Sequence, residues 1–263
     1  MTRLAANLSM LFADAPFLDR FDRAGAAGFE AVEFLFPYDH SIAEVKSRLD
    51  RNGLSLTLIN AFAGDWAGGE RGFAARPGKE AQFEASVDQA IEYATGLGCP
   101  RIHVMSGITA GEPDASACEA AWIRNMRLAA DRAGTAGLKV SIEPLNSRDV
   151  PGYFLAHQDP TLELIARLDR RNVLLQFDVY HTQIMDGDII RRIERLKGAY
   201  GHVQIAGVPD RHEPDTGELN YAAIFEAFDR TGFDGFLGCE YNPRGLTEEG
   251  LAWAAPFLPR KAA

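Results

Sequence analysis

Apolar segments alternate with amphipathic segments along the whole chain, and a glycine marks almost every junction between them. An amphipathic stretch ends and an apolar one begins at seven places, where the chain carries Gly28, Gly53, Gly98, Gly137, Asn172, Gly198 and Gly232. Glycine and asparagine tolerate the left-handed backbone that closes a helix, so each place predicts a helix end followed by a strand. With one strand before the first junction, the pattern predicts eight strands.

The expected strands lie at residues 4–10, 29–36, 54–60 and 101–106, and four more lead to or contain Glu143, Asp178, Gln204 and Glu240. The expected helices lie at about residues 16–28, 41–52, 79–96, 115–136 and 188–197, with one capped by Asp159 and Pro160 and one between Asn220 and Gly232. A short helix near residues 247–253 closes the pattern. Residues 61–77 form a glycine-rich loop whose length is typical of binding loops and lids.

Strict alternation of strands and helices predicts a parallel sheet covered by helices. Eight such units in 263 residues fit a closed α/β barrel, so we predict a single (β/α)8 TIM barrel domain over residues 1–263. A doubly wound open sheet is the alternative, but the GxGxxG motif typical of that fold does not follow the first expected strand.

Polar side chains stand at the carboxyl ends of the last four expected strands, where the catalytic groups of barrels lie. They are Glu143, Asp178, Gln204 and Glu240. Each alone could be a strand-end cap or an ion-pair partner, but four at matched positions favour one site. Two residues earlier on each strand, one layer deeper, the residues are polar or small where a packing layer would be Val, Ile or Leu: Ser141, Gln176, His202 and Gly238.

The residue types at these strand ends predict a divalent metal ion as cofactor. Three carboxylates that converge in a low-dielectric cup repel one another unless a cation lies between them. All four candidate ligands offer oxygen atoms, and oxygen ligands favour Mg²⁺ or Mn²⁺ over Zn²⁺.

Four further polar residues are expected on the same face. His181 follows Asp178 by three positions and could polarise a substrate carbonyl or donate to a loop backbone, and Asp149 follows Glu143 by six. Arg211 and Arg71 lie in the loops after the seventh and third expected strands, where an arginine could bind a substrate carboxylate or form a surface ion pair. We treat all four as candidate substrate-binding residues.

Composition narrows the class of partner. The net charge of −10 and the pI near 5.1 disfavour a protein that binds nucleic acid by neutralising phosphates. No run of 18 apolar residues and no apolar signal-peptide core is present, so we expect no membrane association and no export. The three cysteines have no paired spacing, which is typical of buried thiols in a reducing, cytoplasmic compartment.

Eight segments spread over nearly the whole length carry specific motifs, among them IEPLN, QFDVYH and GCEYNP: residues 6–12, 32–39, 63–72, 142–146, 176–181, 201–206, 217–221 and 238–243. Together they resemble the hydroxypyruvate isomerase family, within the xylose-isomerase-like TIM barrel superfamily that also contains ketose 3-epimerases. The resemblance implies a divalent metal ion bound by Glu143, Asp178, Gln204 and Glu240. It further implies that Glu143 and Glu240 form the acid–base pair, with His181 and Arg211 near the substrate.

The resemblance also implies a reaction. Hydroxypyruvate and 2-hydroxy-3-oxopropanoate (tartronate semialdehyde) differ by a proton on adjacent carbons, with carbonyl and hydroxyl exchanged. One carboxylate would remove a proton, the metal ion would stabilise the enediolate, and the other carboxylate would return a proton, so no organic cofactor is required. The expected partner is a small 2-oxo or hydroxy acid, and a homo-oligomer is an open expectation.

Several alternatives remain at this point. An isomerase of the larger 2-oxotetronate would share the site and differ only in its pocket. A ketose 3-epimerase is disfavoured because those enzymes have histidine as the third ligand, where this chain has Gln204. A zinc-dependent abasic-site endonuclease would need a histidine-rich site and a basic face, and a barrel that binds the ion only for structure would not be an enzyme.

Overall fold

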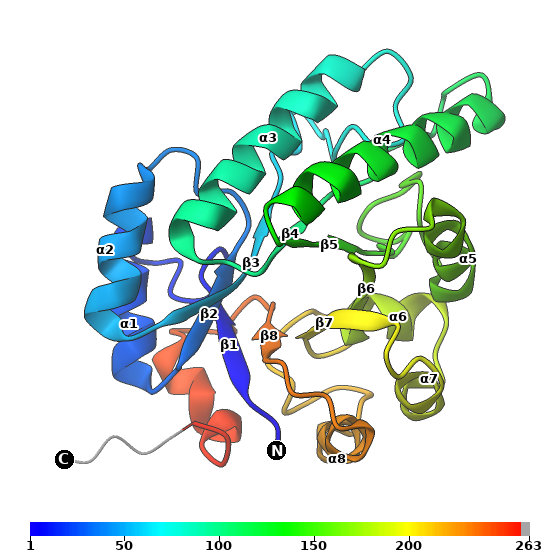
Figure 1. The fold of residues 1–263 in the computed structure, drawn as a ribbon. Coiled ribbons are helices and arrows are strands. Elements are labelled where there is room, and N and C mark those ends of the chain that lie inside the picture. Colours follow the sequence, from blue (N-terminus) through cyan, green and yellow to red (C-terminus); the bar gives the residue numbers. More distant parts are fainter. Residues whose placement is uncertain (259–263) are drawn as a thin grey trace. The chain divides into compact units, whose positions relative to one another are not determined.

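The structure is a computed structural model that describes residues 1–258, and its strands follow one another in sequence order in a closed parallel barrel (Figure 1). The strands are β1 (Leu4–Asn7), β2 (Ala31–Phe34), β3 (Ser55–Asn60), β4 (Arg101–His103), β5 (Lys139–Ile142), β6 (Val173–Asp178), β7 (Tyr200–Ile205) and β8 (Leu237–Cys239). The helices are α1 (Phe17–Ala27), α2 (Ile42–Asn52), α3 (Glu80–Leu97), α4 (Ala115–Thr135), α5 (Gln158–Leu168), α6 (Val179–Met185), α7 (Ile189–Arg195), α8 (Tyr221–Thr231) and the 3₁₀ helix η1 (Glu248–Ala254). The predicted eight-stranded (β/α)8 barrel is confirmed.

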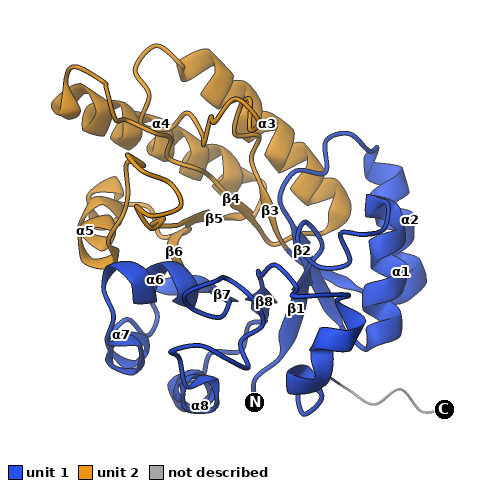
Figure 2. Cartoon of the chain, turned by 180° about the vertical axis from the view of Figure 1, so that it is seen from behind, with its two compact units in different colours: residues 1–57, 177–263 blue, residues 58–176 orange. Residues whose placement is uncertain are grey.

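The chain divides into two compact units, coloured separately in Figure 2. The first contains residues 1–57 together with the segment from residue 177 onward, and the second contains residues 58–176. In the first unit β1 pairs with both β2 and β8, and β7 pairs with β8. The register places Asn7 beside Glu33, and Gly238 beside both Ala5 and Gln204. In the second unit β4 pairs with β3 and β5, and β5 with β6.

Glycines in the left-handed conformation end four helices as predicted. They follow α1, α2, α3 and α8 and are Gly28, Gly53, Gly98 and Gly232. The prediction that Asn172 ends a helix is wrong, because α5 ends earlier, at Leu168, and its C-cap is Asp169, whose φ is 54°. Asn172 instead donates its side-chain amide to the carbonyl oxygens of Ala130 at 2.8 Å and Leu138 at 3.3 Å.

Two further helix predictions need correction. The N-cap of α5 is His157, so Asp159 and Pro160 lie within the first turn, where a missing N–H costs nothing because no partner exists there. The chain between β6 and β7 holds two short helices instead of one. The unpredicted helix, α6, follows β6 without a linker, and the Asp178 carboxylate accepts a hydrogen bond from the Tyr180 N–H at 2.7 Å.

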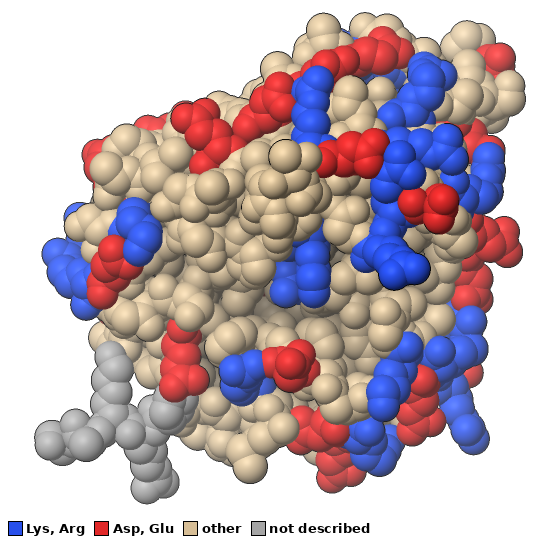
Figure 3. Space-filling view, viewed as in Figure 1, with Lys and Arg blue, Asp and Glu red and all other residues tan. Residues whose placement is uncertain are grey.

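The surface and core agree with the composition. Cys99, Cys118 and Cys239 are free thiols buried in the core, as predicted. On the face drawn in Figure 3, Lys and Arg side chains lie among Asp and Glu side chains. Within residues 1–258, no helix has the length and apolar character needed to cross a membrane.

Candidate active site

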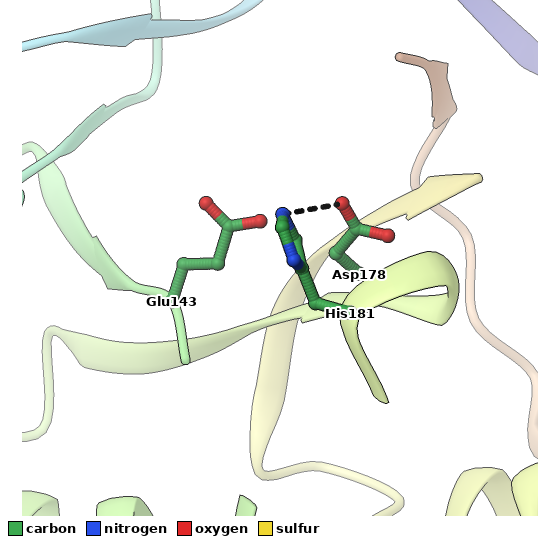
Figure 4. A group of neighbouring side chains, drawn as sticks. All are labelled: Glu143, Asp178 and His181. Atoms are coloured by element: carbon green, nitrogen blue, oxygen red, sulfur yellow. Dashed lines mark ion pairs between the residues drawn. The ribbon is translucent and has the colours of Figure 1, made fainter. Parts of the chain in front are cut away.

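Five of the predicted site residues lie in the first unit. Arg211 contacts two of them, Glu240 and Asp178. Its guanidinium donates to Glu240 Oε2 at 2.5 Å and lies 3.7 Å from Asp178 Oδ2. His181 Nε2 also lies 3.7 Å from Asp178 Oδ2, the ion pair drawn in Figure 4. Asp178, His181 and Glu240 are each less than 9% exposed, so these charges interact with little screening by water.

Gln204, the fifth of these residues, belongs to a second set of contacts centred on Glu33, which the sequence analysis did not single out. Glu33 is fully buried and accepts hydrogen bonds from Gln204 Nε2 at 2.8 Å and Asn7 Nδ2 at 3.0 Å. Its other oxygen lies 2.7 Å from His202 Nε2. The same Asn7 nitrogen donates to Glu240 Oε1 at 3.2 Å, which joins the two sets of contacts. The only feature of the sequence that could have drawn attention to Glu33 is its charge, because the residues around it in the run AVEFLF are apolar.

The deeper layer expected below the strand ends is buried at all four positions: Ser141, Gln176, His202 and Gly238. The absence of a side chain at Gly238 makes room for the carboxylate of Glu33. A Cβ atom there would lie 2.3 Å from Glu33 Oε2 and 2.4 Å from Glu33 Oε1. The glycine on β8 therefore makes the space that the Glu33 carboxylate fills.

Arg211 adopts a left-handed backbone conformation, with φ at 56°. This is uncommon for a residue with a Cβ atom, so the surrounding loop must hold it. Its N–H donates to the Gly207 carbonyl at 2.9 Å, and its carbonyl accepts from the Asn242 N–H at 2.8 Å. The guanidinium carbon lies 5.0 Å from the centre of the Tyr180 ring. Arg211 is therefore fixed at its backbone and at its charged end.

The remaining predicted residues lie in the second unit. Glu143 directly follows β5, is 5% exposed, and has one oxygen 3.8 Å from His103 Nε2. Arg71 packs its guanidinium 3.8 Å from the Trp66 ring centre and donates to the Trp66 carbonyl at 3.0 Å. Asp149 is exposed and accepts a hydrogen bond from the buried Asn146 amide at 3.1 Å.

Burial shifts the proton affinity of two carboxyl groups in the first unit. It raises the pKa of Glu240 to about 8; Arg211 opposes this shift, and Asp178 and Glu33 add to it through their negative charges. Burial likewise raises the pKa of Asp178 to about 6, against the charge of Arg211 and the backbone N–H groups of Tyr180 and His181. A carboxyl group whose pKa lies near neutrality can both take and give a proton, as general acid–base catalysis requires.

These shifts predict how stability depends on pH in the metal-free protein. The pKa of Glu240 is about 8 in the folded protein and 4.5 as its ordinary value, so the folded form binds the proton more tightly. Its contribution to stability is therefore complete below the ordinary value and is lost as pH rises through the folded value. We expect Glu240→Gln to raise the free energy of unfolding at pH 9, where the buried carboxylate is ionised in the wild type, and to raise it far less at pH 5. Thermal unfolding in EDTA at both pH values measures this, and an equal effect at both would contradict it.

Buried oxygen atoms in this part of the fold suit a cation. Asp178 Oδ2 is buried and accepts no hydrogen bond within residues 1–258. Within the first unit, Asp178 and His181 are buried side by side and offer a carboxylate oxygen and an imidazole nitrogen, both of which can be metal ligands (Figure 4). Asp178 belongs to the predicted ligand set, and His181 is an additional candidate ligand. The donor chemistry therefore fits a divalent cation.

Comparison with known proteins adds evidence from outside the chain. A family model described as xylose isomerase-like TIM barrel matches residues 21–257. A 2-oxo-tetronate isomerase of Cupriavidus necator is 51% identical over 260 residues, which are 99% of this chain and 100% of that protein. A hydroxypyruvate isomerase of Escherichia coli is 42% identical over 257 residues, which are 98% of this chain and 100% of that protein.

A solved structure is also closely similar. It is described as an AP endonuclease of family 2 from Brucella melitensis. It is 52% identical, has a TM-score of 0.96, and the match covers 98% of this chain and 100% of that one. The two curated relatives and this structure thus match nearly the full length of the chain.

Proposed function

The chain belongs to the xylose isomerase-like TIM barrel family and is an isomerase, and we propose that its substrate is 2-oxotetronate. The observation that carries the proposal is that the 2-oxo-tetronate isomerase of Cupriavidus necator is more similar to this chain than the hydroxypyruvate isomerase of Escherichia coli. The motifs alone placed hydroxypyruvate first and 2-oxotetronate second. The relatives favour the reverse order.

The proposed reaction moves one proton between adjacent carbons. In 2-oxotetronate, a carboxylate of the enzyme removes the proton from C3, which carries a hydroxyl, and the electron pair moves to form an enediolate over C2 and C3. The second carboxylate returns a proton to C2, and the hydroxyl proton moves between the two oxygens, so carbonyl and hydroxyl have exchanged places. We assign these two roles to Glu143 and Glu240. The pKa of Glu240, raised to about 8 by burial, supports its part, because that group holds a proton for part of the time at neutral pH.

Other residues of the chain would hold and orient the reactants. Arg211 fixes Glu240 by a hydrogen bond of 2.5 Å and carries the positive charge that a substrate carboxylate requires. His181 is buried beside Asp178 and could donate to the substrate carbonyl. Arg71 and Asp149 stay as predicted contacts to the substrate.

We assign a divalent metal ion, Mg²⁺ or Mn²⁺, to Glu143, Asp178, Gln204 and Glu240, with His181 as a further candidate ligand. When bound, the ion would stabilise the negative charge that develops on the two substrate oxygens. The oxygen-rich donor set and the buried Asp178 Oδ2 support this assignment.

The substrate assignment predicts a measurable preference. We expect kcat/KM for 2-oxotetronate to exceed that for hydroxypyruvate at least about tenfold, because one additional carbon in a matched pocket contributes 1–3 kcal/mol. The assay follows each substrate by NMR in D₂O with Mg²⁺ or Mn²⁺ and records deuterium at C2 and C3. A higher kcat/KM for hydroxypyruvate would contradict the proposal and identify hydroxypyruvate as the substrate.

The same protein should be tested against DNA that contains an abasic site, because the similar solved structure is described as an AP endonuclease. The net charge of −10 disfavours that activity. Incision of abasic DNA without isomerisation of either acid would overturn the proposed function. A reducing, cytoplasmic compartment and association into a homo-oligomer also stay proposals, the latter tested by light scattering.

A further inference from the structure

Glu33 has no part in the proposed proton transfer. It is nevertheless a charged residue in an otherwise apolar strand, and its carboxylate contacts three polar side chains of the first unit: Asn7, His202 and Gln204. We propose that Glu33 is a positioning residue that determines which atom of Gln204 faces the reacting groups and how the Glu240 carboxylate is held. This inference rests on the proposed function, but it can be tested by Mn²⁺ affinity, a measurement that does not depend on turnover.

The first step concerns the amide of Gln204, which has a donor end and an acceptor end. Gln204 Nε2 donates to Glu33 Oε1 at 2.8 Å. That oxygen also accepts from Asn7 Nδ2 at 3.0 Å, so it acts as an acceptor toward both amides. If the Gln204 amide flipped, its carbonyl oxygen would meet an acceptor at the same short distance, which costs a buried hydrogen bond. Glu33 therefore keeps the NH₂ group of Gln204 on its own side and leaves Oε1 of Gln204 as the atom for a cation.

The second step concerns Glu240, which Glu33 reaches through Asn7. The Asn7 side-chain oxygen accepts from the Ser9 N–H at 3.0 Å, so the orientation of its amide is fixed. Its two amide hydrogens then serve Glu33 Oε1 and Glu240 Oε1, the latter at 3.2 Å. Because Arg211 holds Glu240 Oε2, both oxygens of Glu240 have a defined partner.

The third step concerns how Glu33 itself is held. His202 Nε2 lies 2.7 Å from Glu33 Oε2, and both side chains are at most 2% exposed. Gly238 leaves the room, since a Cβ atom there would lie 2.3 Å from the same oxygen. Each oxygen of the Glu33 carboxylate has a polar partner, and the carboxylate packs against Gly238. These contacts hold the carboxylate in one position. Such support commonly changes metal affinity or activity about 10- to 100-fold when it is removed.

The test uses Glu33→Gln, which keeps the shape but replaces one acceptor by a donor. We expect Mn²⁺ affinity, measured by calorimetry on the full chain, to fall about tenfold or more, and kcat to fall about 10- to 100-fold with a smaller change in KM. The double variant Glu33→Gln/Gln204→Glu restores the hydrogen bond to residue 204 with reversed polarity and keeps an oxygen ligand there, but it leaves the Asn7 amide facing a donor, so Mn²⁺ affinity should recover in part. The matched control is Thr231→Val, which removes the buried hydrogen bond to Tyr200 at 3.2 Å and should lower Tm without changing Mn²⁺ affinity.

If Glu33→Gln does not fold, Gly238→Ala gives the same test, because it keeps every partner of Glu33 but leaves no space for its carboxylate. Unchanged Mn²⁺ affinity in the folded variants, or a loss that the double variant does not recover even in part, would overturn the inference. Failure of the wild type to isomerise either acid would overturn the proposed function instead, while the Mn²⁺ affinities would still report on Glu33.

Discussion

Replacing Glu143 or Glu240 by glutamine is expected to lower kcat for isomerisation by about a thousandfold, within the range that general acid–base groups contribute. Glutamine keeps the size of the side chain but can neither accept nor return the proton. Both residues are at most 8% exposed, so water cannot easily replace the missing group. Turnover of 2-oxotetronate in D₂O, followed by NMR, measures the loss.

The position at which deuterium enters the substrate distinguishes the two carboxylates. A variant that lacks the group that removes the C3 proton should show no exchange at C3, whereas a variant that lacks only the second group should still exchange at C3 without forming product. The exposed glutamates Glu163 and Glu226 provide matched controls, since glutamine there should leave kcat unchanged. Wild-type rates in both site variants would exclude the two-carboxylate mechanism.

Removal of divalent metal ions is expected to have an effect of similar size. A bound ion contributes several kcal/mol to transition-state stabilisation, and each 1.4 kcal/mol corresponds to about a tenfold change in rate. We therefore expect chelation to lower kcat at least about a thousandfold, with recovery when Mg²⁺ or Mn²⁺ is added back. Asp178→Asn should weaken Mn²⁺ binding, because it replaces one oxygen of a buried carboxylate by an amide that donates.

The measurement for this second prediction is the rate before and after chelation, with the residual metal quantified by mass spectrometry. Full activity at a metal content far below one ion per chain would show that the carboxylates act without an ion. The exposed Asp149 supplies a control, since Asp149→Asn should leave Mn²⁺ affinity unchanged even if it alters KM.

The order of the elements could be predicted from the sequence because the signals for it are local. Gly28 or Gly232 ends a helix through its own backbone freedom, whatever the rest of the chain does. The same reasoning fails at Asn172, because another residue that tolerates the left-handed conformation, Asp169, comes three positions earlier. It also misses α6, whose N-cap is the Asp178 carboxylate that the sequence analysis assigned only to chemistry.

The support around the site could not be predicted in the same way, because it depends on pairing between distant segments. Glu33 and Gln204 are separated by 171 positions, and nothing within the run AVEFLF indicates which residue Glu33 will meet. The space for its carboxylate comes from Gly238, on yet another strand. Asp178, Gln204 and Glu240 could be placed near the carboxyl ends of β6, β7 and β8 from sequence, because that placement needs only position along a strand. The roles of Asn7 and Glu33 depend on which residues lie beside them, so they can be recognised only when the register between neighbouring strands is known.

The hydrogen bond between Asn7 and Glu240 spans 233 positions, and β1 pairs along one edge with β8. Ribosomes add about 5 to 20 residues per second, so β1 leaves the ribosome on the order of 10 to 50 s before β8 does. During that interval the backbone groups on one edge of β1 have no native partner, and an open strand edge is a template for pairing with other chains. Slow translation of the last quarter of the message should therefore favour aggregation during synthesis, although the finished protein has no open edge at this position.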